Sequence, residues 1–240
     1  MMKSVARRLE EELGIPRKSV RIFSNSRIPE KPLLAAAGIA SYGKNSLALA
    51  PRLGSLFVIA GAILPLPSFE HATSTAAEPW DPCGSCRRCI DACPAGAIIE
   101  PGLVDPGLCL QGLAASPVTL TPDDMEIWGT RLYGCQDCQV VCPHNVGLAE
   151  EAPDVAGGIG PSVSLRRFLS LDAATLKDFF RGTPMGLSWV STDALLRNAL
   201  IAAGNRRDPA ARLEVERFAA SESRMLRETA QWALERLPAG

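Results

Sequence analysis

The sequence predicts an α+β protein of three successive regions, residues 1–75, 76–150 and 160–240. Three observations favour this organisation. Short apolar runs separated by a turn predict strands in the first region, all eight cysteines lie in the second, and apolar residues with helical spacing dominate the third. A chain of 240 residues is long enough to bury the cores of one or two domains.

A helix is predicted at the start of the first region. Val5, Leu9 and Leu13 recur every four residues, so residues 3–13 form an amphipathic helix that Gly14 ends. The segment is charged and lacks the apolar stretch of a signal peptide, which favours a cytoplasmic protein.

Two apolar runs predict strands further along the first region. Ser46–Ala50 and Ser55–Leu64 are joined by Pro-Arg-Leu-Gly, which predicts a β-hairpin. The run from Leu56 to Leu64 is too short to cross a bilayer and is interpreted as a buried strand, so no membrane association is expected. Gly38 and Gly43 are expected to allow a close backbone approach.

The cysteines of the second region form two halves of one pattern, with none left over. The first half, CGSCRRCIDACP, begins at Cys83; the second begins at Cys109 and resumes as CQDCQVVCP at Cys135. The run C-x2-C-x2-C-x3-C-P is typical of bacterial ferredoxins, where three thiolates hold one 4Fe–4S cluster and the fourth ligates the other. The pattern therefore predicts two clusters, one held by Cys83, Cys86, Cys89 and Cys142 and the other by Cys93, Cys109, Cys135 and Cys138.

Two other uses of cysteine fit less well. A zinc ribbon also contains C-x2-C pairs, but it gives no reason for the prolines that follow Cys93 and Cys142. A disulfide framework requires an oxidising compartment, whereas low-potential clusters require a reducing interior. The sequence therefore predicts one-electron transfer in the cytoplasm.

The second half of the pattern is interrupted. Asp105–Ala115 and Pro122–Leu132 are predicted helices inserted between Cys109 and Cys135. A plain ferredoxin has an uninterrupted second motif, and a simple electron carrier has no need of such an insertion.

Charge is spread unevenly around the net value of −1. Residues 1–52 carry ten Lys or Arg against four Glu, residues 53–160 carry three against thirteen acids, and residues 161–240 carry twelve against nine. The basic ends favour an anionic partner such as nucleic acid, although solvated helix faces would give the same pattern.

The third region is predicted to be helical. Asp193–Asn205 places five apolar residues on one face, and Gly204 and Asn205 are expected to end that helix. Two amphipathic helices follow at about 209–220 and 222–237. Short helices with tight turns suggest a HEAT-like stack, and helices that only cover the iron–sulfur domain remain an equal alternative.

The order of these motifs resembles the epoxyqueuosine reductase family from about residue 24 to the C-terminus. The stretch AAAGIASYGKNSLALAPRLGSLFVIAGAILPLP precedes the first cysteine half, and RLYGCQDCQVVCPHN and LLRNALIAAGN follow it. The last two are the most specific, because ordinary ferredoxins lack them. The family reduces the epoxide of epoxyqueuosine in the tRNA anticodon loop, with cobalamin beside two 4Fe–4S clusters.

The resemblance implies a fold and a set of partners. Residues 1–75 would be the remnant of a nitroreductase-like cobalamin-binding domain in an N-terminally shortened member, followed by a ferredoxin-like double-cluster domain and HEAT-like helices. Lys44, Asn45 and Ser46 of the GKNS stretch would bind cobalamin. The expected partners of the monomeric protein are tRNA and a low-potential donor of the flavodoxin or ferredoxin type. The tRNA phosphates would be held near Arg197, Arg206, Arg207 and Arg212.

No catalytic residue is assigned. The family's acidic proton donor has no counterpart in Ser24–Lys31, which contains no Asp, so the proton would come from water or Glu30. Two functions stay open: a cobalamin-dependent reductase of the epoxyqueuosine type, or a non-catalytic double 4Fe–4S electron-transfer protein.

Overall fold

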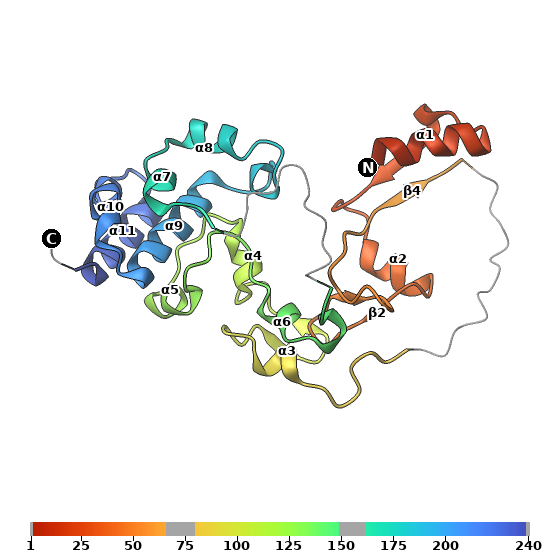
Figure 1. Ribbon diagram of the computed structural model, residues 1–240, viewed down its shortest axis with the longest axis horizontal. Helices are drawn as coiled ribbons and strands as arrows, with labels where there is room; N and C mark the ends of the chain where they lie inside the picture. Colours follow the sequence, from red (N-terminus) through yellow and green to blue (C-terminus); the bar gives the residue numbers. More distant parts are fainter. Residues whose placement is uncertain (1, 66–79, 149–161, 239–240) are drawn as a thin grey trace. The chain divides into compact units, whose positions relative to one another are not determined.

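The computed structural model describes residues 2–65, 80–148 and 162–238, and it confirms a mixed helix and sheet protein (Figure 1). The chain divides into two compact units, and each is made of three separate segments. Unit 1 comprises Met1–Ile90, Glu100–Leu103 and Cys138–Glu151, and unit 2 comprises Asp91–Ile99, Val104–Asp137 and Ala152–Gly240. The boundaries predicted at residues 75, 150 and 160 fall outside the described residues.

Unit 1 contains short strands and two helices of its own. Helix α1 is the predicted N-terminal helix, and Gly14 follows it with a φ of 66° and donates its N–H to Glu10 O. The elements are α1 (Met2–Leu13), β1 (Arg21–Phe23), α2 (Glu30–Ala36), β2 (Ser41–Tyr42), β3 (Ala48–Leu49) and β4 (Gly61–Ile63).

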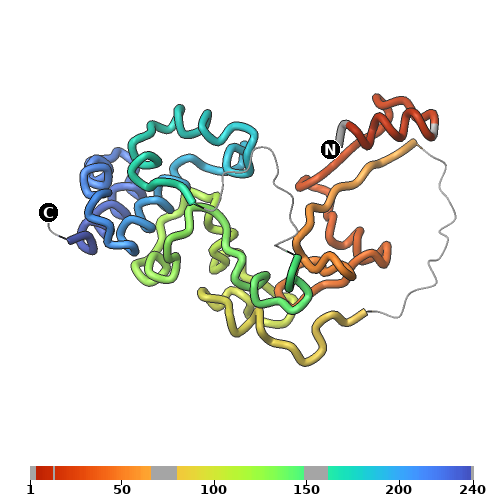
Figure 2. The backbone as a smooth tube through the Cα atoms, in the orientation of Figure 1, coloured from red at the N-terminus to blue at the C-terminus, as the bar shows by residue number. Residues whose placement is uncertain are grey.

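The predicted hairpin of Ser46–Ala50 with Ser55–Leu64 is wrong. Strand β3 pairs antiparallel with β2, and β4 pairs antiparallel with β1. Figure 2 traces the backbone in colours that follow the residue number. An isolated bridge joins Ala50 to Gly54, the last residue of the turn. The prediction of a buried strand fails with it, since Val58 is 77% exposed.

Gly54 and Asn145 explain why the two runs separate. The turn that begins at Ala50 closes with Gly54 at a φ of 55°, a left-handed conformation that favours glycine. The next residue, Ser55, donates its backbone N–H to Asn145 Oδ1 at 2.8 Å. A Cβ on Gly54 would overlap the Asn145 side chain and the His144 carbonyl. The chain after Gly54 therefore binds the segment around Asn145 and does not pair with Ser46–Ala50.

Unit 2 is built around one buried helix. Helix α9 (Thr192–Arg206) confirms the helix predicted over 193–205, and it contacts α4, α5, α7, α8 and α11 (Figure 1). The bounds of these helices and of α10 are α4 (Leu110–Ala114), α5 (Pro122–Trp128), α7 (Leu165–Leu169), α8 (Ala173–Phe179), α10 (Arg212–Phe218) and α11 (Arg224–Arg236). Whether they form a HEAT-like stack stays a prediction.

The ends of the helices differ from the predicted ones. Gly204 and Asn205 lie inside α9, which ends at Arg206, and Arg207 takes the left-handed conformation with a φ of 51°. Gly204 is needed for packing, because a Cβ there would lie 2.7 Å from Trp232 Cζ3. Helix α4 begins only at Leu110, with Cys109 as its N-cap residue.

Four short elements lie next to the cysteines. Among the described helices of the whole protein, none is long and apolar enough to cross a membrane. Strands β5 and β6 pair with each other. The four elements are α3 (Arg88–Asp91), β5 (Ile98–Glu100), β6 (Leu103–Val104) and α6 (Asp137–Val140).

Helix α5 depends on a capping box. Thr121 Oγ1 accepts from Asp124 N at 3.1 Å, and the Asp124 carboxylate accepts from Thr121 N at 3.1 Å. We expect Thr121→Ala to lower the free energy of unfolding by about 1 kcal/mol, because the backbone N–H of Asp124 loses its acceptor and the Asp124 carboxylate loses the hydroxyl donor. Urea denaturation measures the change. Thr119→Ala, at an exposed site two residues earlier, is the control, and equal effects of both variants would contradict the role of the cap.

Candidate metal centre

Four cysteines from the two halves of the pattern line one small cavity in unit 1. Cys83, Cys86 and Cys89 come from the first half and Cys142 from the second, and the cavity has a volume of about 40 Å³. The other lining residues are Lys44, Asn45, Leu49, Pro82, Arg88, Pro143 and His144. The structure thus brings together the four side chains predicted to hold one cluster.

The loop that carries the first three cysteines is shaped by backbone hydrogen bonds. Asp81 Oδ1 accepts from Cys83 N at 2.9 Å and from Gly84 N at 3.1 Å, and Cys86 N donates to Cys83 O at 2.8 Å. The bonds from Cys83 and Gly84, together with the Lys44 charge, lower the pKa of the Asp81 carboxyl. The loop therefore keeps its shape through its own residues.

Lys44 binds this loop in three places. Its backbone N–H donates to Cys83 Sγ at 3.4 Å, and its Nζ donates to Gly84 O at 2.6 Å and Cys86 O at 2.9 Å. An ammonium group has three N–H donors, so one is left for another acceptor. The contact of Lys44 with cobalamin stays a prediction. In the structure, its visible role is to fix the cysteine loop and to place a positive charge there.

Asn45 and Ser46 shape the turn that presents Lys44. Asn45 is buried, and its Oδ1 accepts from Leu47 N at 3.2 Å. Ser46 has a φ of 61°, and its carbonyl accepts from Lys31 Nζ at 2.9 Å. The expected close approach at Gly43 is confirmed, because a Cβ there would lie 2.8 Å from Asn45 Oδ1. No observation tests these residues as cofactor ligands.

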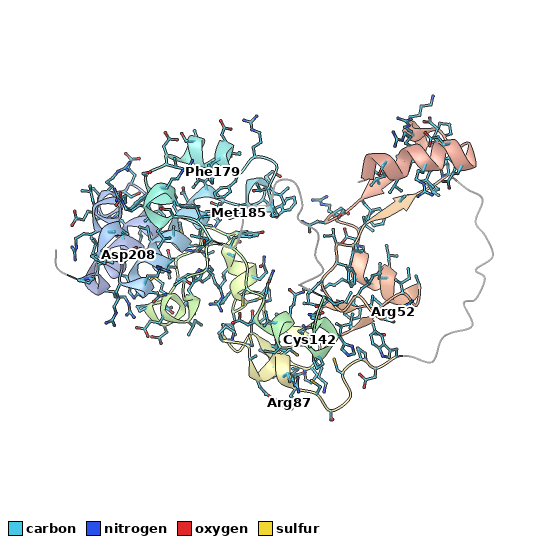
Figure 3. The ribbon with its side chains drawn as sticks, viewed as in Figure 1. Arg52, Arg87, Cys142, Phe179, Met185 and Asp208 are labelled. Carbon is cyan, nitrogen blue, oxygen red and sulfur yellow. The ribbon has the colours of Figure 1, made fainter. Side chains whose placement is uncertain are left out.

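The Cys142 side of the cavity is tied to the N-terminal segment of unit 1 by Asn145, a residue that was not predicted from the sequence. Asn145 N donates to Cys142 O at 3.0 Å, and its buried side chain holds Ser55 and the Gln139 carbonyl. His144 Nε2 lies 2.7 Å from Pro82 O, the residue before Cys83. Figure 3 labels Cys142 and Arg87, which lie on the two chain segments joined here.

The other four cysteines are divided between the units. Cys93, Cys109 and Cys135 lie in unit 2, and Cys138 lies in unit 1, three residues after Cys135. Cys93 Sγ accepts from Ala97 N at 3.2 Å, and Cys135 N donates to Gln111 Oε1 at 3.2 Å. Their common role as the second ligand set stays a prediction.

All eight cysteines are free thiols, and the donor set suits iron–sulfur clusters. Burial raises the pKa of the Cys89 and Cys135 thiols, so binding of metal must release their protons. In the described part of the chain, no three His, Cys, Asp or Glu side chains could hold one metal ion together. A 4Fe–4S cluster binds each thiolate through a different iron, and backbone N–H donors to sulfur, as at Cys83 and Cys93, are typical of its surroundings.

Glu30 is a carboxylate in this structure. Its Oε1 accepts from Ser26 N at 2.9 Å, and hydrogen bonds from the Ser26 and Glu30 backbone lower its pKa. A carboxyl group with a lowered pKa is ionised at neutral pH and is a poor proton donor. Of the two expected proton sources, this favours water.

The expected phosphate contact of Arg197 is wrong, because this residue is fully buried. Arg212 donates to the Leu237 and Pro238 carbonyls and so fastens the end of the chain. Arg206 and Arg207 are exposed, and Arg206 lines a cleft of about 910 Å³ in unit 2 together with Met185 and Asp208 (Figure 3).

The cysteine pattern, its cavity and the hydrogen bonds to sulfur define the class of protein as an iron–sulfur protein with a double 4Fe–4S cluster binding domain, whose family model matches residues 82–145. The chain is also 33% identical over 206 residues to the epoxyqueuosine reductase of Listeria monocytogenes, covering 84% of this chain and 52% of the relative. It is 30% identical over 240 residues to that of Bacillus subtilis, covering 95% and 59%.

Solved structures agree with these relatives. A crystal structure of epoxyqueuosine reductase with a tRNA-Tyr epoxyqueuosine-modified stem loop matches with a TM-score of 0.75 and 25% identity, over 98% of this chain and 61% of the other. The enzyme from Streptococcus thermophilus matches with a TM-score of 0.75 and 26% identity, over 98% and 61%. The resemblance to epoxyqueuosine reductases is confirmed, and the chain spans between half and two thirds of the length of these relatives.

Proposed function

We propose that the protein is an oxidoreductase of the epoxyqueuosine reductase type that converts epoxyqueuosine in tRNA to queuosine. The observation that carries the proposal is the meeting of Cys83, Cys86, Cys89 and Cys142 in one cavity beside Lys44. The similarity to the relatives extends through nearly the whole chain. This extent favours a reductase over the alternative, a bare double-cluster electron carrier, which would need only the cysteine region.

The chain's own residues would hold two clusters and a corrinoid. The clusters supply electrons singly, and the corrinoid supplies the centre for reduction of the epoxide, when all are bound. Cys83, Cys86, Cys89 and Cys142 are the proposed ligands of the first cluster, and the remaining four cysteines those of the second. The third N–H of Lys44, with Asn45 and Ser46, suits the amide groups of a corrinoid next to the first cluster.

The remaining parts of the proposal concern architecture and partners. Unit 1 would contain part of a nitroreductase-like domain, and unit 2 a HEAT-like stack. Exposed Arg206 and Arg207 suit the phosphates of tRNA. The proposed setting is the cytoplasm, with a monomeric protein reduced by a flavodoxin or ferredoxin.

A titration followed by turnover tests the proposal. The protein is reconstituted anaerobically, and cob(II)alamin binding is followed by EPR. The protein is then reduced and incubated with an RNA stem loop that contains epoxyqueuosine. The nucleosides of the stem loop are identified by mass spectrometry. We expect an altered cobalt signal and the formation of queuosine. Intact clusters with an unchanged cobalt signal and no product would contradict the reductase and leave the electron carrier.

Lys44→Met tests the part of Lys44 in the first site. The variant removes a positive charge and two hydrogen bonds from the cysteine loop. A nearby positive charge favours the reduced cluster, so we expect a more negative reduction potential, by up to about 59 mV, a tenfold change for one electron. Redox titration by EPR measures it. Lys44→Arg should keep most of the potential. Lys31→Met is the control, since it removes a charge that contacts the Ser46 carbonyl and the Tyr42 ring instead of the cysteine loop. An equal shift in Lys31→Met would contradict a specific effect.

A further inference from the structure

Two neighbouring polar residues lie fully buried in the middle of α9. Arg197 and Asn198 are 0% exposed, and every residue around them from Ala194 to Gly204 is also buried. Burial of a charged or amide group is costly unless its donors and acceptors are paired. Burial lowers the pKa of Arg197 to about 10, so the guanidinium still carries its charge at neutral pH. Two polar side chains buried side by side therefore require hydrogen-bond partners that compensate the cost of their burial.

The guanidinium of Arg197 pairs with backbone carbonyls in the last turn of α4 and in the segment that follows it. Nη1 donates to Ser116 O at 2.9 Å and Val118 O at 2.6 Å, and Nη2 donates to Leu113 O at 2.9 Å. Within the described part of the chain, no carboxylate forms an ion pair with it. The carbonyl end of a helix carries partial negative charge, which compensates the buried cation.

Asn198 joins two chain segments with one amide. Its Nδ2 donates to Ala114 O at 3.0 Å and to Leu132 O at 2.8 Å, while its Oδ1 accepts from Arg197. Asn205, two turns further along α9, repeats the arrangement on α5: its Nδ2 donates to Met125 O at 2.7 Å and Gly129 O at 2.9 Å.

Both segments carry cysteines. Ala114 is the last residue of α4, whose N-cap residue is Cys109, and Leu132 lies three residues before Cys135. Gln111 on α4 accepts from Cys135 N, which links the same two segments a second time. The inserted stretch between the two cysteines therefore takes its position from α9.

We propose that Arg197, Asn198 and Asn205 are positioning residues for the second cluster, and that they fix Cys109 relative to Cys135 through the carbonyls of the inserted stretch. The inference rests on the proposed function only in taking these two cysteines as cluster ligands. Residues that do not bind the metal themselves, but hold its ligands in position, affect how tightly the metal is retained. The helix that contains RNALIAAGN thus fixes the position of two cysteines.

Asn198→Ala tests the proposal by counting iron in the full chain. We expect the reconstituted variant to retain half of the wild-type iron and sulfide, and its EPR spectrum to keep one cluster signal. Leu226→Ala, in α11 of the same hydrophobic core, is the control for stability. It is expected to lower the unfolding temperature and to keep all of the iron. Full iron in Asn198→Ala, or equal iron loss at equal unfolding temperature in both variants, would overturn the proposal.

Hydrogen–deuterium exchange of the apo-protein gives a second measurement that does not depend on clusters. Asn198→Ala should exchange faster over residues 109–135 than the wild type, and Leu226→Ala should exchange faster in α10 and α11 instead. Unchanged exchange over 109–135 in Asn198→Ala would refute the positioning role. A protein that binds both clusters and gives this exchange pattern, but forms no queuosine from epoxyqueuosine, would refute the proposed function alone.

Discussion

Replacing Cys142 with serine is expected to halve the iron of the reconstituted protein, from about eight to about four atoms per chain, because each 4Fe–4S cluster needs four thiolates. Cys142 is the only member of its set that comes from the second cysteine half, and it is buried at the cavity. The loop of Cys83, Cys86 and Cys89 alone leaves one iron without a ligand. Iron and sulfide analysis measures the loss, and EPR identifies the cluster that remains.

Cys138→Ser provides the matched comparison. It lies four residues earlier in the same motif, and it is assigned to the other cluster. The variant should lose the same amount of iron but retain a different EPR signal. Identical spectra of the two variants would contradict the assignment of these cysteines to different clusters. Val140→Ala, at a site that is 73% exposed between them, should keep all of the iron.

Replacing Arg197 with methionine is expected to lower the free energy of unfolding of unit 2 by about 3–5 kcal/mol. The change removes the three part-buried hydrogen bonds from the Arg197 guanidinium to the carbonyls of Leu113, Ser116 and Val118, of which Leu113 O and Ser116 O keep backbone donors. A hydrogen bond to a charged group contributes about 1.5–3 kcal/mol. Methionine is long enough to reach the Trp128 ring, now 5.2 Å from the guanidinium carbon, but it cannot restore the hydrogen bonds.

Urea denaturation of the anaerobic apo-protein measures this change. Helix content reports mainly on unit 2, because most of the described helices, including α9 and α11, belong to it. Arg206→Met, at an exposed position of the same helix, is the control, and we expect it to change stability by less than about 0.5 kcal/mol. If Arg197→Met matched that control, the buried cation would make no net contribution, and the hydrogen bonds to α4 would not stabilise the unit.

The spacing of the cysteines and the period of apolar residues predicted much of the protein. The meeting of Cys83, Cys86, Cys89 and Cys142 in one cavity could be predicted, because in this motif three thiolates of one half and one of the other share a site. The helix at 193–205 could be predicted because its apolar residues have a helical period. Local signals of these kinds do not depend on the rest of the chain.

Partners that lie far apart in the sequence could not be predicted in this way. The run after Ser55 looked like one arm of a hairpin, but Asn145, 90 residues later, fixes its direction. Arg197 looked like a surface cation, although the buried residues on every side of α9 are typical of a helix enclosed by others. The contact of Lys44 with the Cys83 loop, which joins residues 39 positions apart, could not be predicted from local signals either.

The order of synthesis gives Asn145 a further significance. A ribosome releases the N-terminal strands and the first three cysteines of unit 1 long before residues 138–148, which complete the cavity and hold Ser55. Unit 1 therefore cannot be completed until residues 138–148 have been synthesised, and the first two segments of unit 2, Asp91–Ile99 and Val104–Asp137, are translated before them. Three exposed thiols would wait on the nascent chain without their fourth partner. Cells that make this protein must keep those thiols reduced and free of stray metal until the second half emerges.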